Sequence, residues 1–102
     1  MRLSQSQAQT IRESALSNFG GDAQVWLFGS RVRDDEKGGD IDLYIEVQAQ
    51  SASDLMTSKL KFLRDLHKRL GDQKIDVVLR KTNGSAELPI YQIAKQTGIQ
   101  LQ

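Results

Sequence analysis

Two aspartates two positions apart, Asp40 and Asp42, are the residues of this sequence whose types and spacing most directly predict chemistry. They stand at the start of the segment Ile41 to Val47, in which apolar and polar residues alternate as in a half-buried strand. Side chains two positions apart in a strand point to the same face, so these carboxylates lie side by side. Like charges this close raise each other's proton affinity unless a cation lies between them, which predicts a divalent metal site.

A third carboxylate, Asp76, interrupts an apolar run over 74–80 that is predicted to be a strand. Aspartate is disfavoured in strands, so a role in a site is favoured over plain surface charge. If the strands of Asp42 and Asp76 are neighbours in one sheet, three carboxylates converge on its polar face. Oxygen ligands that leave room for substrate phosphates suit Mg²⁺, and two such ions about 3.5 to 4 Å apart can clamp the attacking and leaving oxygens of a phosphoryl displacement.

A glycine and a serine, Gly29 and Ser30, end the apolar run of residues 25–28. Glycine lets a ligand approach the backbone, and serine supplies a hydroxyl and an amide. Arg31 follows and is the best-placed cation for a phosphate. The alternative role for Ser30 is a helix cap, which uses the same exposed N–H groups. These residues predict an anion site beside the metal site.

The elements that must position these residues follow from hydrophobic periodicity and from cap residues such as the Ser4 and Gln7 pair. They predict an α/β (α+β) fold in a single domain over 1–102, with a small mixed sheet of three or four strands and helices packed mainly on one face. The expected helices cover 4–19, 51–70 and 89–97, and the expected strands cover 24–28, 41–47, 74–80 and 99–101.

Spacing also predicts which side of each element enters the core. For the strand over 41–47, one face is expected in the core and the other is expected to be polar. The last helix is expected to bury one face made of Ile90, Ile93, Ala94 and Thr97. The helix over 51–70 is expected to bury a broad stripe made of Leu55, Met56, Leu60, Phe62, Leu63, Leu66 and Leu70.

Composition and charge exclude several classes of protein. The 102 residues include 14 basic and 13 acidic ones, and the net charge of +1 gives no global field for nucleic acid or anionic lipid as the main partner. The absence of cysteine excludes disulfides and thiolate zinc sites. No stretch is long and apolar enough to span a membrane, and the N-terminus lacks a signal-peptide run, so a cytoplasmic location is expected.

Three short motifs together resemble the DNA polymerase beta type nucleotidyltransferase superfamily: Leu-Phe-Gly-Ser (27–30), Asp-Ile-Asp-Leu (40–43) and Ile-Asp-Val (75–77). Within it, the chain length and the Gly-Ser-Arg variant are most similar to the minimal nucleotidyltransferases of prokaryotes. The resemblance implies that Gly29 and Ser30 hold a nucleoside triphosphate, ATP or another. It also implies that Asp40 and Asp42 bind magnesium ions, and that Asp76 completes the site and helps to activate an acceptor hydroxyl.

The resemblance further implies a partner, because the helical acceptor-binding domain usual for the superfamily is not among the predicted elements. Minimal members pair with a separate all-helical protein of the HEPN or substrate-binding type, and several pairs act as toxin and antitoxin. The expected activity is therefore Mg²⁺-dependent transfer of AMP from ATP to a hydroxyl on the partner, with this chain as the antitoxin. The alternative is a non-catalytic nucleotide-binding module that neutralises or assembles with a helical partner by binding alone, and homo- and hetero-oligomers both stay open.

Overall fold

The computed structural model describes residues 4–29, 41–48, 51–71, 74–81 and 88–102. The described residues form helices on both sides of a four-stranded mixed sheet, which confirms the predicted fold class. The elements are α1 (Gln5–Phe19), β1 (Gln24–Phe28), β2 (Ile41–Val47), α2 (Ala52–Leu70), β3 (Ile75–Lys81), α3 (Pro89–Thr97) and β4 (Ile99–Gln100).

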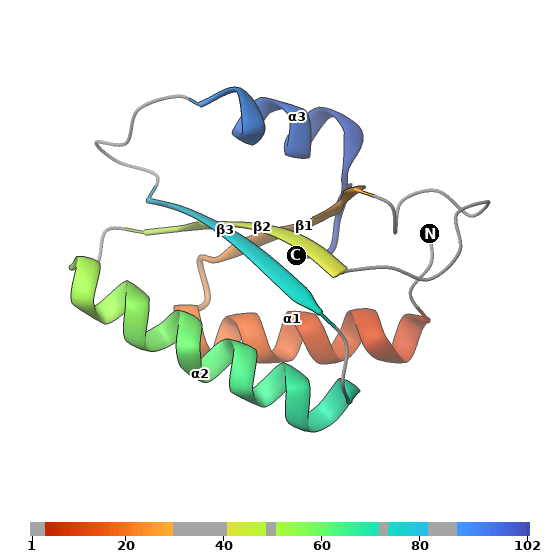
Figure 1. Cartoon of the computed structure of the whole chain (residues 1–102), viewed down its shortest axis with the longest axis vertical. Coiled ribbons are helices and arrows are strands. Elements are labelled where there is room, and N and C mark those ends of the chain that lie inside the picture. The colour runs from red at the N-terminus through yellow and green to blue at the C-terminus, as the bar shows by residue number, and fades with distance from the viewer. Residues whose placement is uncertain (1–3, 30–40, 49–50, 72–73, 82–87) are drawn as a thin grey trace.

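The strand order in the sheet is β3-β2-β1-β4. β1 is antiparallel to both of its neighbours, whereas β2 and β3 are parallel. Parallel neighbours need a crossover connection, and α2 supplies it. α1 and α2 lie together on one face of the sheet and α3 lies on the other (Figure 1). The prediction that helices pack mainly on one face is therefore confirmed.

Local signals in the sequence set the helix ends as expected. At the start of α1, the Gln7 N–H donates to Ser4 Oγ and the Ser4 N–H donates to Gln7 Oε1, each at 3.0 Å. At the start of α2, Ser51 Oγ accepts from the Asp54 N–H at 3.1 Å. Each bond satisfies an N–H group that the helix itself leaves unpaired.

The main core fills the space between the sheet and the α1–α2 pair. Phe19 of α1 and Phe62 of α2 pack there with ring centroids 5.2 Å apart. On the surface of the same helix pair, Arg69 donates to Glu13 at 2.8 Å and lowers the pKa of that carboxyl below its usual value. The fully buried apolar residues of this core include Ile11, Ala15, Val25, Leu27, Ile41, Leu43, Ile45, Val47, Phe62 and Leu66.

The buried stripe of α2 is narrower than its leucines predict. Leu66 is fully buried, whereas Met56 and Leu60 are 55% and 59% exposed, so their predicted burial is wrong. At about 100° per residue, these two side chains lie on the side of α2 opposite to Phe62 and Arg69, which contact α1. The core therefore takes only the side of α2 that faces α1 and the sheet.

α3 buries a different face from the predicted one. Tyr91 and Ala94 are buried, whereas Ile90 and Ile93 are 36% and 50% exposed and Thr97 is also exposed. Ala94 is thus the one member of the predicted face that the core contains. The reason is that α3 packs on a sheet face made of aromatic side chains, where the Tyr91 ring stacks, and not on the aliphatic core.

The second face of β2 was expected to be polar along its whole length, and this expectation is wrong for the half that α3 covers. Tyr44 is fully buried and Glu46 is 7% exposed, because α3 covers this half of the face. Asp42, on the same face, is only half-buried. α3 therefore divides the face into a covered half and an open half that carries Asp42.

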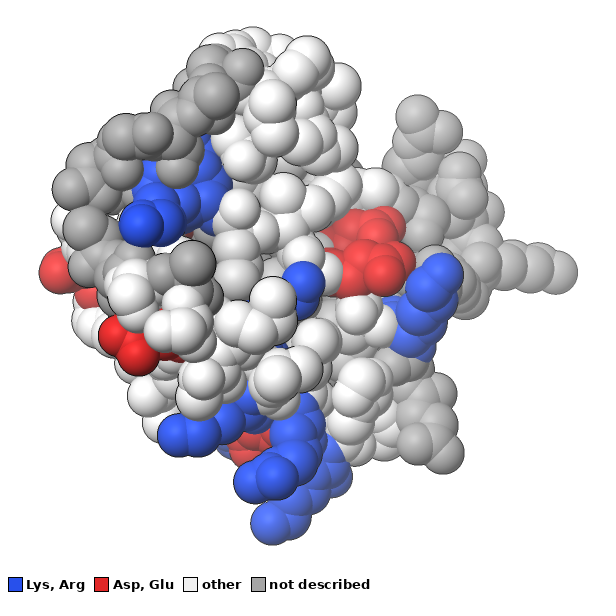
Figure 2. Space-filling view, turned by 60° about the vertical axis from the view of Figure 1, so that its left-hand side comes forward, with Lys and Arg blue, Asp and Glu red and all other residues white. Residues whose placement is uncertain are grey.

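Charge on the molecular surface is mixed. Figure 2 shows basic side chains at the lower end of the view, at its upper left and beside an acidic patch on the right, with further acidic side chains on the left. This distribution agrees with the formal net charge of +1. Among the described helices, none combines the length and the apolar character needed to cross a membrane.

Two leucines of contrasting burial test this account of the core. We expect Leu66→Ala, at a position with 0% exposure, to lower the free energy of unfolding by about 2 to 5 kcal/mol because it leaves a cavity. Leu88→Ala removes the same atoms at a 46% exposed position and should change it by no more than about 0.5 kcal/mol. Urea unfolding of both variants measures the difference, and equal losses would contradict the packing described.

Candidate active site

The C-terminal end of β1 and the N-terminal ends of β2 and β3 meet at one end of the sheet (Figure 1). The antiparallel register places Phe28 opposite Asp42, and the parallel register places Asp42 opposite Asp76. Side chains of residues directly opposite each other project from the same face. The supposition that these two aspartates lie on neighbouring strands is thus correct. Asp42 is half-buried and Asp76 is exposed, so the pair faces solvent.

Gly29 brings the end of β1 against the carboxylate of Asp42. A Cβ atom at Gly29 would overlap Asp42 Oδ2 and would lie 3.1 Å from Asp42 Cγ. The residue also has φ +78°, in the left-handed region that costs other residues roughly 1–2 kcal/mol. Only glycine meets both conditions without strain, which explains why a glycine stands beside Asp42. Its predicted role in binding a nucleoside triphosphate stays a prediction.

The remaining predicted site residues, Ser30, Arg31 and Asp40, lie outside the described residues, and their roles stay predictions. In the described ranges, no group of three or more histidine, aspartate or glutamate side chains is placed to hold a metal ion. Asp42 and Asp76 supply two neighbouring carboxylates, and such oxygen donors suit a hard cation such as Mg²⁺. A bound Mg²⁺ would neutralise the charge of substrate phosphates there.

Glu46 is a buried carboxylate that was not predicted from the sequence. It lies four residues after Asp42, on the same face of β2. Its Oε2 atom accepts from the Tyr44 hydroxyl at 2.6 Å and lies 3.2 Å from Lys95 Nζ and 3.9 Å from a guanidinium nitrogen of Arg80. Burial, and then the hydrogen bond to Glu46, raise the pKa of Tyr44 well above its usual value. The phenol therefore remains a neutral donor.

Aromatic contacts complete this Glu46 cluster and hold α3 on the sheet. The Tyr44 ring stacks on Tyr91 at 5.5 Å and contacts Trp26 at 5.3 Å. Arg80 lies over the Tyr91 ring at 4.8 Å, and Lys95 lies over the Trp26 ring at 5.4 Å. Each cation thus contacts both the carboxylate and an aromatic face, an arrangement that stabilises a partly desolvated charge.

The signal for this cluster is present in the sequence but weak. In the alternation of apolar and polar residues along β2, Glu46 is expected to be an ordinary exposed residue. Only its contact with Lys95 of α3, which is far away in the sequence, shows that it is buried. The spacing of Tyr91, Ala94 and Lys95 is the helical pattern of a face that can cover aromatic and acidic side chains. The cluster holds α3 over one half of the sheet face, and Asp42 lies on the half that α3 leaves open.

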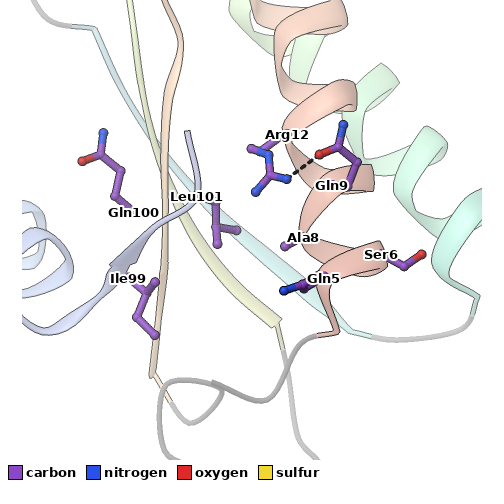
Figure 3. A pocket seen from close by; sticks show the side chains of 8 residues that line it. All are labelled: Gln5, Ser6, Ala8, Gln9, Arg12, Ile99, Gln100 and Leu101. Atoms are coloured by element: carbon purple, nitrogen blue, oxygen red, sulfur yellow. Dashed lines mark hydrogen bonds between the residues drawn. The ribbon is translucent and has the colours of Figure 1, made fainter.

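A separate pocket of about 540 Å³ lies between α1 and the segment that includes β4 (Figure 3). Figure 3 shows the Arg12 side chain hydrogen-bonded to Gln9 at one side of it. The pocket is on the α1 side of the sheet, whereas Asp42 and Asp76 project from the other face, so it is not part of the candidate site. Its lining consists of Gln5, Ser6, Ala8, Gln9, Arg12, Ile99, Gln100 and Leu101.

The Glu46 cluster leads to a testable difference between two glutamates. We expect Glu46→Ala to lower the free energy of unfolding by at least about 1 to 3 kcal/mol, because it leaves buried donors without their acceptor. Glu13→Ala removes an exposed ion pair and should have a much smaller effect. Thermal unfolding followed by tryptophan fluorescence measures both, and a Glu46→Ala variant as stable as Glu13→Ala would refute the role of the cluster.

Comparison with known proteins assigns a family to this arrangement. A family model described as a nucleotidyltransferase domain matches residues 8–99, a range that includes Gly29, Asp42 and Asp76. No curated protein matches the chain. The match extends over most of the sequence and agrees with the fold and with the motifs that first indicated it. The chain therefore belongs to the nucleotidyltransferase domain family, which supports nucleotidyl transfer as its class of reaction.

Proposed function

We propose that this protein transfers a nucleoside monophosphate, AMP from ATP, to a hydroxyl on a partner protein, with Mg²⁺ as cofactor. The observation that carries the proposal is the register that sets Asp42 opposite Asp76, with Gly29 against the Asp42 carboxylate. Membership of the nucleotidyltransferase domain family supports the reaction class.

The proposed roles follow the chemistry of each side chain. Asp40, Asp42 and Asp76 would hold Mg²⁺, and Gly29, Ser30 and Arg31 would contact the triphosphate. In the transfer, the acceptor oxygen forms a bond to the α-phosphorus, and the bond from that phosphorus to pyrophosphate breaks. Asp76 is the exposed member of the described pair, so an acceptor arriving from solvent can reach it and pass its hydroxyl proton to it.

The proposed acceptor is a tyrosine hydroxyl of a separate all-helical protein of the HEPN type, with this chain as the antitoxin of a cytoplasmic toxin-antitoxin pair. The open position of the carboxylates supports an acceptor on a macromolecule, because Asp42 and Asp76 lie on the half of the sheet face that α3 leaves uncovered.

The second candidate function is a nucleotide-binding module that neutralises its helical partner by binding alone. The apolar side chains exposed on α3 and at its N-cap favour it, since the N-cap residue Leu88 and the helical residues Ile90 and Ile93 are 46%, 36% and 50% exposed. Such a surface suits contact with another helix and does not require the aspartates.

Loss of one carboxylate separates the two functions. When the chain is expressed together with the helical protein encoded by the adjacent reading frame, intact-mass analysis should show AMP-sized additions on that protein. We expect Asp42→Asn to abolish them, because the amide is a poor ligand for Mg²⁺. Asp22→Asn, an exposed turn residue, is the matched control and should leave them in place. An unmodified partner in a soluble complex, or full neutralisation by Asp76→Asn, would favour binding alone.

The contact between Gly29 and Asp42 gives a second test of the catalytic proposal. Gly29→Ala should lower the rate of AMP transfer by about 100-fold, because the new methyl group displaces the Asp42 carboxylate. Gly21→Ala adds the same methyl group where no atom lies within 4 Å and should leave the rate unchanged. Transfer rates from radiolabelled ATP measure both effects, with urea unfolding to confirm that each variant folds. Normal transfer by Gly29→Ala would show that this contact is dispensable.

A further inference from the structure

α2 concentrates positive charge in its C-terminal half. Residues 59–69 include five lysines and arginines but only one acidic residue, Asp65. The whole chain has a formal net charge of +1, so the rest of the sequence is net negative. α2 is the lowest element in Figure 1, and Figure 2, which is turned about the vertical axis, shows basic side chains at the same lower end. The chain is thus nearly neutral as a whole but strongly basic along one helix.

Three of these cations, Lys61, Arg64 and Lys68, lie on one side of α2. Their spacing of three and then four residues places them on one stripe of the helix, within about 10.5 Å along its axis. All three side chains are exposed. Like charges at this spacing repel one another and destabilise a helix. An anion bound between them would remove that repulsion.

The three cations line a groove of about 320 Å³ between α1 and α2, here named the cation groove. On the α1 side, Ser17 supplies a hydroxyl, whereas the Asn18 amide donates to the Ser14 carbonyl at 2.9 Å and is held in the wall. Small-molecule sites have volumes of about 300 to 1,000 Å³, so the groove can hold a compact ligand. Its lining consists of Ser17, Asn18, Lys61, Arg64, Asp65 and Lys68.

Asp65, the carboxylate in this lining, does not neutralise the three cations. Its Oδ2 atom lies 3.5 Å from a guanidinium nitrogen of Arg69, which also donates to Glu13 at 2.8 Å. The three cations take part in none of the ion pairs found within the described residues. The cation groove therefore carries positive charge that a bound anion can balance through charge-assisted hydrogen bonds.

The lining favours a short chain of phosphates as this anion. Arg64 can donate to two phosphate oxygens at once, and lysine binds phosphate as a point charge. Among the described residues, the groove includes no aromatic side chain on which a base could stack, so the phosphates alone would be recognised. A nucleic-acid backbone fits less well, because such binding typically rests on about 6 to 10 phosphate contacts.

We propose that the cation groove binds an oligophosphate, either free or linked to a nucleoside, at a site separate from the aspartates. α1 and α2 cover one face of the sheet, whereas Asp42 and Asp76 project from the other. Binding in the groove needs no metal ion, because lysine and arginine supply the counter-charge. A carboxylate pair repels phosphates unless a cation such as Mg²⁺ is bound. The inference does not depend on the proposed transfer reaction.

Isothermal titration calorimetry with sodium tripolyphosphate, in EDTA at low salt, tests the proposal. We expect saturable binding that Arg64→Gln and Lys68→Gln each weaken at least about tenfold, because each removes a charged donor. Arg12→Gln is the matched control. It makes the same change on α1 in the separate pocket beside β4, and it should keep the natural affinity. Circular dichroism confirms that each variant folds.

Separate titrations with pyrophosphate and with ATP, both without metal, identify the source of the oligophosphate as the ligand that binds more tightly. Absence of saturable tripolyphosphate binding by the natural chain would overturn the proposal. Natural affinity in both Arg64→Gln and Lys68→Gln, or a loss in Arg12→Gln equal to theirs, would overturn it as well. Tighter binding of a short RNA duplex than of tripolyphosphate would refute it in favour of a nucleic-acid surface.

Discussion

The parallel pairing of β2 with β3 is the constraint on which the rest of the structure depends. Parallel neighbours cannot be joined by a tight turn, so the chain must cross the sheet through α2 before it returns. The same pairing brings the first residues of both strands to one end of the sheet, where Asp42 and Asp76 stand opposite each other. A slip of one residue would send these carboxylates to opposite faces, so the register and the site are inseparable.

The second constraint is the division of one sheet face between α3 and the carboxylate pair. Burying Glu46 costs desolvation free energy, and that cost is offset only when the Tyr44 hydroxyl and the cations of Arg80 and Lys95 are in place. α3 can therefore dock in few other positions without leaving a buried charge uncompensated. The half of the face that carries Asp42 is accessible because α3 docks over the other half.

Much of the fold follows from local chemistry in the sequence, whereas the outer faces of two helices do not. The helix caps were predicted, because they depend on residue type and local spacing. That the strands of Asp42 and Asp76 are neighbours was only a supposition, and the register that sets these residues opposite each other comes from the structure. In α3, stripes through Ile93 and through Tyr91 both fit a helical period, and only the aromatic surface beneath decides between them.

The burial of Glu46 likewise depends on cations that approach from distant segments of the chain. Met56 and Leu60 resemble core residues by type, yet in this fold α2 packs against too few elements to bury all of its apolar side chains. The predictions for Ser30, Arg31 and Asp40 concern residues outside those that the structure describes.

The position of Trp26 has a practical consequence for spectroscopy. It is the one tryptophan of the sequence, and it lies in the cluster beneath α3 instead of the core beneath α1 and α2. Its emission therefore reports the environment of the α3 face. The positive charge of the Lys95 ammonium group lies over the Trp26 ring, so the emission should also respond to the position of that charge. Far-ultraviolet circular dichroism is weighted toward the longer helices of the opposite layer. The two layers of this protein thus carry separate optical signals, and a difference between their transitions would reveal α3 leaving the sheet before the rest unfolds.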